Sequence, residues 1–133
     1  GSEMCIRDRN KHDLRSLGEM FDNDAEILVS PLLEPVGRVE YLGWQELFFE
    51  AFPDASISVI DTFGGNDWAV SEIHLKGTNS GPYINNISTG KTIDLKAGYL
   101  VRFNESGTIS SLKFFIDSST ILKQLEIEPV AIN

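Results

Sequence analysis

Residues 37–68 read GRVEYLGWQELFFEAFPDASISVIDTFGGNDW, and the spacing of their apolar side chains changes at Pro53. Up to the proline, apolar residues recur every three to four positions, which predicts an amphipathic helix over 37–52. Proline cannot continue a helix, so the helix ends there. Beyond it, apolar residues alternate with serines, which is typical of a strand, and Gly-Gly-Asn-Asp at 64–67 predicts a hairpin turn.

The flanking sequence adds helices and strands on both sides of this stretch. Downstream, alternating segments predict strands at 68–76, 91–103 and 108–116 and then a short helix at 118–125. Upstream, the pattern predicts a short helix at 12–21 and a strand at 25–30, separated by the polar break Asp22-Asn23-Asp24. Because helices come first and hairpins later, the order predicts an α+β domain rather than an alternating α/β one.

The composition is typical of a soluble globular protein, and it contains too few cysteines and histidines for a disulfide or a metal site. Its 133 residues suit one domain with a sizeable core, and no apolar run approaches the roughly 20 residues of a membrane helix. The net charge of −9 argues against nucleic acid as a partner, because phosphates would be repelled. A single Cys5 excludes an internal disulfide, and two separated histidines are too few for a metal site. We therefore expect a cytoplasmic protein that takes no cofactor and binds no membrane.

The first nine residues are set apart from the rest. Gly1-Ser2 is typical of a scar left by tag removal, and Met4 to Arg9 resembles a translated sequencing adapter. We expect residues 1–9 to be a tag scar and a non-native leader, and residues 10–133 to form a single domain.

Short motifs in order along the chain carry a resemblance to a known family. They are GRVE at 37–40, FPD at 52–54, GTNSGPY at 77–83, TGK at 89–91, RF at 102–103, and Asp117 followed by LKQL at 122–125. Together they resemble the SnoaL-like polyketide cyclase family, in which position 79 is commonly His rather than Asn.

The resemblance implies a nuclear-transport-factor-2-like (cystatin-like) fold, a cone-shaped roll. In that fold a curved, mostly antiparallel sheet wraps around the long helix and leaves a central pocket. It also implies a small hydrophobic ligand or substrate, and pairing of two copies through the outer face of the sheet, so we expect a homodimer. Compared with the family, this chain lacks a full first helix.

Asp117 is the candidate proton carrier, because cyclases of the family place a carboxylate at this strand-to-helix junction. In an apolar cavity its pKa would rise, and it would exchange protons near neutral pH. Asp117 also precedes Ser118-Ser119-Thr120, so it could instead cap the last helix. Alternation places Lys113 and Phe115 on the same face; Phe115 suits a pocket wall, and Lys113 would pair with Asp117 and lower its pKa.

His74 and Tyr99 are the other candidates for chemistry. His74 could carry a proton or orient a carbonyl, although a lone His on a strand is more often solvent-facing or paired. Tyr99 stands where the family frequently has a polar pocket residue and could donate to an oxyanion, although a buried tyrosine more often serves mainly in packing. On the long helix, Tyr41, Trp44 and Phe48 are candidates to line the pocket.

Three functions stay open at this point. The first is a cofactor-free cyclase or isomerase in which Asp117 moves a proton beside a carbonyl and Tyr99 or His74 stabilises the enolate oxygen. The second is a binding domain for an apolar ligand, with Lys113 neutralising Asp117. The third is an epoxide-type hydrolase, which would need a second carboxylate to hold a water.

Overall fold

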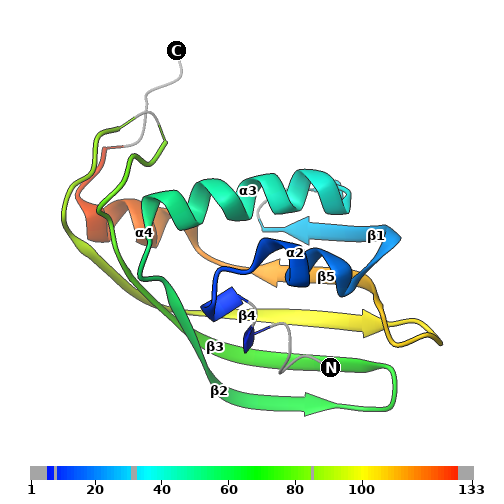
Figure 1. Cartoon of the computed structure of the whole chain (residues 1–133). Coiled ribbons are helices and arrows are strands. Elements are labelled where there is room, and N and C mark those ends of the chain that lie inside the picture. The colour runs from blue at the N-terminus through cyan, green and yellow to red at the C-terminus, as the bar shows by residue number, and fades with distance from the viewer. Residues whose placement is uncertain (1–5, 8, 31–32, 85, 129–133) are drawn as a thin grey trace.

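The computed structural model describes residues 6–7, 9–30, 33–84 and 86–128, and it is built on one curved sheet (Figure 1). The strands are β1 (Phe21–Val29), β2 (Ser56–Gly64), β3 (Trp68–Thr78), β4 (Thr92–Phe103) and β5 (Ile109–Phe115). The helices are α2 (Leu14–Glu19), α3 (Arg38–Ala51) and α4 (Ser118–Leu125). The expected α+β class is confirmed.

The strand order in the sheet is β1-β5-β4-β3-β2. Strands β2 to β5 follow one another along the chain and pair antiparallel; short turns join β2 to β3 and β4 to β5, and the longer loop 79–91 joins β3 to β4. Gly107, with a φ of +84°, forms part of the turn between β4 and β5, where a left-handed conformation favours glycine. Strand β1 lies at the opposite edge of the sheet from β2 and pairs with β5 in parallel. Helix α3 connects β1 to β2.

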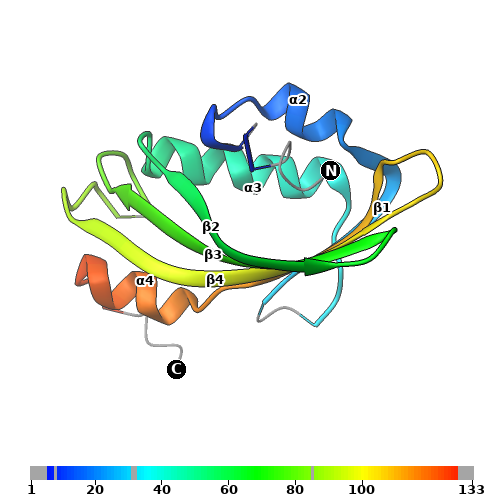
Figure 2. The same cartoon turned by 90° about the horizontal axis from the view of Figure 1, so that it is seen from below.

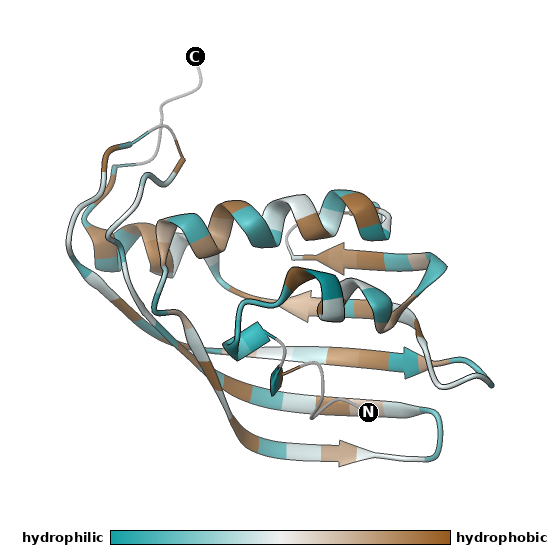
Figure 3. Cartoon of the chain, in the orientation of Figure 1, coloured by the Kyte–Doolittle hydropathy of each residue, from teal (hydrophilic) through white to brown (hydrophobic). Residues whose placement is uncertain are grey.

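Helices α2 and α3 cover the same face of the curved sheet (Figure 2). Polar and apolar residues alternate along much of β3 and β4 (Figure 3), and the buried apolar set, which includes Ile73, Leu75 and Val101, faces these helices. The buried core therefore lies between this inner face and the helices; among its fully buried members are Leu17, Ile27, Tyr41, Phe52, Ile73 and Ile93.

Helix α4 lies along the part of β4 that β5 does not pair with. The side chain of Gln124 accepts from the backbone N–H of Asp94 at 2.7 Å and donates to the Asp94 carbonyl at 2.8 Å. These two bonds replace a strand partner, so the helix covers an edge that would otherwise be open. The predicted range of this helix, 118–125, is confirmed.

The predicted break at residues 22–24 is wrong, because β1 begins at Phe21. The polar residues bulge out of the ladder: Phe21 faces Ile109 and Glu26 faces Ser111, so five steps on β1 match two on β5. A bulge absorbs polar residues within a strand, and the sequence pattern alone cannot tell it from a loop.

Candidate functional site

A pocket of about 800 Å³ opens between α3, the far ends of β1 and β5, and the loop before β4. Its wall is largely apolar and aromatic, as is typical of small-molecule sites. The lining residues include Val29, Trp44, Gln45, Phe48, Leu75, Tyr83, Ile84, Ile116 and Ile121.

A second, smaller cavity of about 40 Å³ lies between the sheet and the N-terminal half of α3. It is lined by Ile6, Leu17, Phe21, Ile57, Ile73, Tyr99, Val101, Ile109 and Leu112. Arg9, Tyr41 and Phe114 line both spaces, so the inner cavity and the outer pocket are neighbours.

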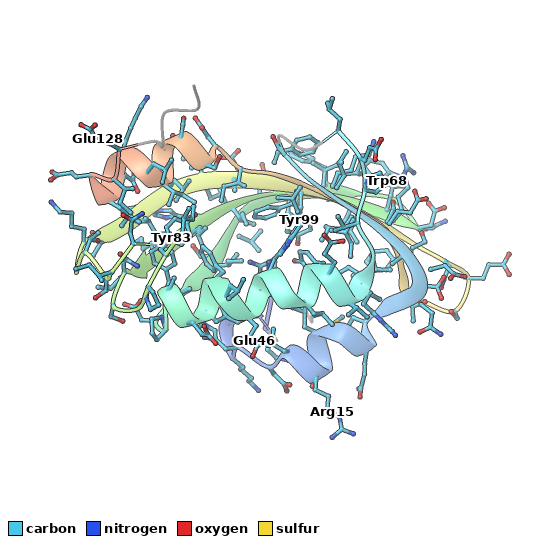
Figure 4. The ribbon with its side chains drawn as sticks, turned by 90° about the horizontal axis from the view of Figure 1, so that it is seen from above. Arg15, Glu46, Trp68, Tyr83, Tyr99 and Glu128 are labelled. Carbon is cyan, nitrogen blue, oxygen red and sulfur yellow. The ribbon has the colours of Figure 1, made fainter. Side chains whose placement is uncertain are left out.

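Tyr99 carries a polar atom of the inner cavity that the protein leaves without a partner. The residue faces inward from β4, is only 8% exposed, and lies in the gap between the sheet and α3 (Figure 4). Its buried hydroxyl makes no hydrogen bond in the described structure, and the same is true of Gln45 Oε1 and Arg9 Nε. Buried polar atoms are normally hydrogen-bonded, so these three atoms are candidates to meet a ligand.

The structure places the three aromatic residues predicted on α3 at the cavities. Tyr41 lines both spaces and is 2% exposed, and Trp44 and Phe48 line the outer pocket. Their spacing of three and four residues keeps them on one face of the helix. Gln45 shares the outer pocket and was not predicted; nothing in its sequence context marks it.

Lys113 and Phe115 face away from the pocket, contrary to the expectation that both lie on its wall and contact the substrate. Both are exposed, Phe115 to 54%, whereas Leu112 and Phe114 point inward. The reason is a bulge at Ser110: Arg102 pairs with Ser111 and Phe103 with Ile109, so β5 has one extra residue. Because side chains alternate, one extra residue moves every later side chain to the opposite face.

Asp117 is solvent-exposed and caps α4, so the expected burial in the pocket is wrong. Its carboxylate accepts from the Ser119 N–H at 3.0 Å, the Ser119 hydroxyl at 2.6 Å and the Thr120 hydroxyl at 3.0 Å. The bond from the Ser119 side chain, followed by that from Thr120, holds the pKa of Asp117 below its usual value. A lowered pKa is the opposite of what a general acid at neutral pH needs. Lys113 forms no ion pair with it in the part of the chain that the structure describes.

His74 also lies on the outer face, where it pairs with Asp94 on the neighbouring strand. The bond from His74 lowers the pKa of the Asp94 carboxyl. His74 lines neither cavity, so the structure does not bring it near Tyr99. The expected proton-carrying His74 at the pocket is therefore wrong in its location: the residue lies on the other face of the sheet and is paired there, as its alternative interpretation had it.

Comparison with known protein families identifies the family to which this chain belongs. Residues 3–125 match the family described as SnoaL-like polyketide cyclase. The chain belongs to the SnoaL-like polyketide cyclase family. A search of curated protein sequences gives no match.

Solved structures show that the SnoaL-like chain has the fold of ketosteroid isomerase and nuclear transport factor 2. AclR, a candidate hydroxylase from Streptomyces galilaeus, is 18% identical with a TM-score of 0.86, over 98% of this chain and 82% of that one. IdmH, a candidate polyketide cyclase from Streptomyces antibioticus, is 24% identical with a TM-score of 0.82, over 94% and 95%. A Catenulispora acidiphila protein with a ketosteroid isomerase-like fold, solved with trimethylamine, is 16% identical with a TM-score of 0.77, over 96% and 92%.

The SnoaL-like loop that starts at Asn79 forms one wall of the outer pocket. Asn79 is fully buried and donates to the carbonyls of Ala51 and Gly81, while its Oδ1 accepts from the N–H and hydroxyl of Thr89. The loop then presents Tyr83, whose ring packs edge-on against Phe52 at 5.4 Å. Burial raises the pKa of the Tyr83 phenol, so this wall stays uncharged.

Among the described residues, Glu50 is the one acidic residue that lines either of these two spaces, and α3 carries its side chain on the side away from Tyr41 and Phe48. Asp117 borders a separate hollow of about 380 Å³, together with Phe115 and Ser118. Glu50 is exposed. No cluster of three or more potential metal ligands is found in the described ranges, and none of the described helices is long and apolar enough to cross a membrane. The lining therefore offers hydrogen bonds and an apolar surface rather than a desolvated acid.

Proposed function

We propose that this SnoaL-like chain is a cofactor-free cyclase or isomerase that binds a small hydrophobic carbonyl compound between α3 and the sheet. The observation that supports the proposal is the buried, unpartnered hydroxyl of Tyr99 in a largely apolar cavity. A carbonyl oxygen of the ligand would accept a hydrogen bond from it, which would satisfy the hydroxyl. The Catenulispora relative, solved with trimethylamine, supports a small ligand in this fold.

In this proposal Tyr99 acts on the oxygen and not on the carbon-bound proton. When a proton leaves the carbon beside the carbonyl, negative charge develops on the oxygen, and a donor fixed in an apolar site stabilises that charge. The released proton passes to solvent water, and the enolate takes a proton back from water when it is quenched at carbon. The exposed, capped Asp117 has no part in this scheme.

We expect Tyr99→Phe to weaken binding of 2-acetonaphthone roughly fivefold to tenfold in calorimetric titrations. The substitution removes one hydrogen bond, worth about 1 kcal/mol net, and keeps the ring. Because the native hydroxyl is buried without a partner, we also expect the unligated variant to be at least as stable as the parent. The matched ligand 2-ethylnaphthalene lacks the carbonyl and should bind parent and variant alike. Equal affinity of the two proteins for the ketone would contradict the role of Tyr99.

An assay of proton exchange distinguishes an enzyme from a non-catalytic binding domain. In deuterated water, a cyclase or isomerase would accelerate exchange of the methyl protons of 2-acetonaphthone, followed by NMR. We expect acceleration by the parent, slower exchange with Tyr99→Phe, and no change with Asp117→Asn. Binding without exchange would favour the alternative of a non-catalytic hydrophobic ligand-binding domain. No observation favours an epoxide hydrolase, since the described lining lacks the carboxylate pair that reaction needs.

We also propose that two copies pair through the outer face of the sheet. Phe63 pairs with Val70, and Trp68 lies two residues before Val70, so all three share that face; they are 63%, 38% and 37% exposed. Phe115 lies on the same face, since it pairs with Gly98, which pairs with Glu72. Exposed apolar patches of this kind mark interaction surfaces.

A lysine at the centre of this patch should prevent pairing. We expect Val70→Lys to sediment as a monomer under conditions in which the parent sediments as a dimer, because the charge would be buried in the interface. Val39 is 80% exposed on α3, away from the outer face, so Val39→Lys is the matched control and should stay dimeric. A parent that is monomeric at all concentrations would overturn the pairing.

A further inference from the structure

Arg9 stands between the inner cavity and the outer pocket. Its Nη1 donates to the hydroxyl of Tyr41 at 2.8 Å, and its guanidinium carbon lies 5.6 Å from the centre of the Phe114 ring. Tyr41 and Phe114 are the two other residues that line both spaces. The guanidinium therefore lies where the outer pocket meets the cavity that holds Tyr99, and we call this boundary the passage.

The passage offers the Arg9 guanidinium few hydrogen-bond partners and no counter-charge among the described residues. Arg9 Nε is buried without a hydrogen-bond partner, and no ion pair joins Arg9 to a carboxylate in the described structure. A partly buried charge without a counter-charge is costly. What the passage does offer is an aromatic face and a hydroxyl that accepts a hydrogen bond, which would suit a neutral planar group carrying an O–H.

The chain is anchored independently just after Arg9. Asn10 exchanges two hydrogen bonds with the backbone of Ile57, at 2.9 and 2.7 Å. His12 stacks on Phe49 with ring centres 4.0 Å apart and bonds to the Ala55 carbonyl at 2.9 Å. These contacts hold the segment on α3 and β2 without the Arg9 side chain, so the fold does not require the guanidinium in the passage.

We propose that the two spaces are one ligand site and that Arg9 occupies the place of the ligand's hydroxylated end. The open site would take a flat, apolar hydroxy-ketone: its hydroxyl donates to Tyr41 over the Phe114 ring, and its carbonyl accepts from Tyr99. This inference rests on the proposed function, since it assumes a carbonyl ligand at Tyr99. In the present chain Arg9 competes with that ligand.

The test compares 2-acetonaphthone with 6-hydroxy-2-acetonaphthone, which carries the hydroxyl at the opposite end from the ketone. We expect Arg9→Ala to bind both compounds at least about fivefold more tightly than the parent, and the hydroxylated compound to gain about fivefold more. Adding Tyr41→Phe to Arg9→Ala should abolish the extra gain for the hydroxylated compound only. Circular dichroism and thermal unfolding report whether each variant keeps the fold.

Two matched variants separate the release of space from the loss of charge. Lys11→Ala removes the same charge two residues away, from an exposed side chain that lines neither cavity, and should bind like the parent. Arg9→Met removes the charge but fills the passage, so it should also bind like the parent. If the parent binds 2-acetonaphthone and Arg9→Ala gains nothing, the inference is overturned while the proposed function stands. If no variant binds either ketone, both are overturned.

Discussion

Replacing Gly81 with alanine is expected to destabilise the protein by about 3 kcal/mol, because no room exists for the added methyl group. An ideal Cβ at this position would lie 2.0 Å from the backbone carbonyl oxygen of Glu50 and 2.9 Å from its carbonyl carbon. Backbone atoms of α3 cannot rotate away as a side chain can. The loop must move instead, which breaks the bond from the Gly81 N–H to the Ala51 carbonyl.

Urea unfolding of Gly81→Ala measures the change in the free energy of unfolding, and calorimetric titration with 2-acetonaphthone measures the affinity of the pocket for the ketone. We expect binding to weaken as well, because Pro82, Tyr83 and Ile84 line the outer pocket just after Gly81. Gly43→Ala is the matched control: it lies within α3, and nothing stands within 4 Å of its ideal Cβ. That variant should gain up to about 1 kcal/mol from helix propensity. A Gly81→Ala protein as stable as the parent would show that the loop adapts without cost.

Most of the helices and strands could be predicted because their physical signals are local. The aromatic residues of α3 repeat at helical spacing and end at a proline, and the observed helix runs from Arg38 to Ala51. Helix α4 was predicted from its polar start and its LKQL ending, and its limits are confirmed. Alternation located β3, β4 and β5 to within about two residues of their ends.

Which side chains of β5 point inward could not be predicted, because this depends on a bulge that no local residue pattern indicates. Counting by twos from the buried Ile109 leads to Lys113, Phe115 and Asp117 as inward residues. The extra residue at Ser110 turns Leu112, Phe114 and Ile116 inward instead. The bulge exists because of register with β4 and β1, which is a property of the assembled sheet.

Some residues of the candidate site could be predicted from the sequence and others could not. Whether a residue could be predicted depends on the helix, strand or loop to which it belongs. The residues on α3 come from a regular helix, so periodicity places them. Tyr99 was indicated by the resemblance to the family, and it faces inward from a strand that is regular at that point. Phe114 and Ile116 follow the bulge, and Gln45 and Tyr83 contribute through tertiary contacts, so the sequence gives no signal for them. Resemblance to cyclases pointed to Asp117, but position in a motif does not determine whether a carboxylate is buried.

The loop that forms the pocket wall depends on one buried amide. Asn79 donates to the Ala51 carbonyl at 3.2 Å and to the Gly81 carbonyl at 2.8 Å, and it accepts from the Thr89 N–H at 2.8 Å and the Thr89 hydroxyl at 2.9 Å. The Ala51 carbonyl is at the C-terminal end of α3, where the helix itself supplies no donor. Asn79 therefore joins the end of α3 to both ends of the loop.

We expect Asn79→Ala to cost about 3–4 kcal/mol in the free energy of unfolding, the largest effect of any variant proposed, because one buried and three partly buried hydrogen bonds are lost at once. Asn86→Ala is the matched control in the same loop: its amide makes one exposed bond, to the Ile84 carbonyl, and its loss should cost less than about 1 kcal/mol. Chemical denaturation of both variants gives the comparison. If the two costs were equal, the loop would be held by the Gly81–Ala51 backbone bond and the Phe52–Tyr83 contact instead. Gly81→Ala would then be the more damaging change, so the ranking of the two variants identifies which contact maintains the pocket wall.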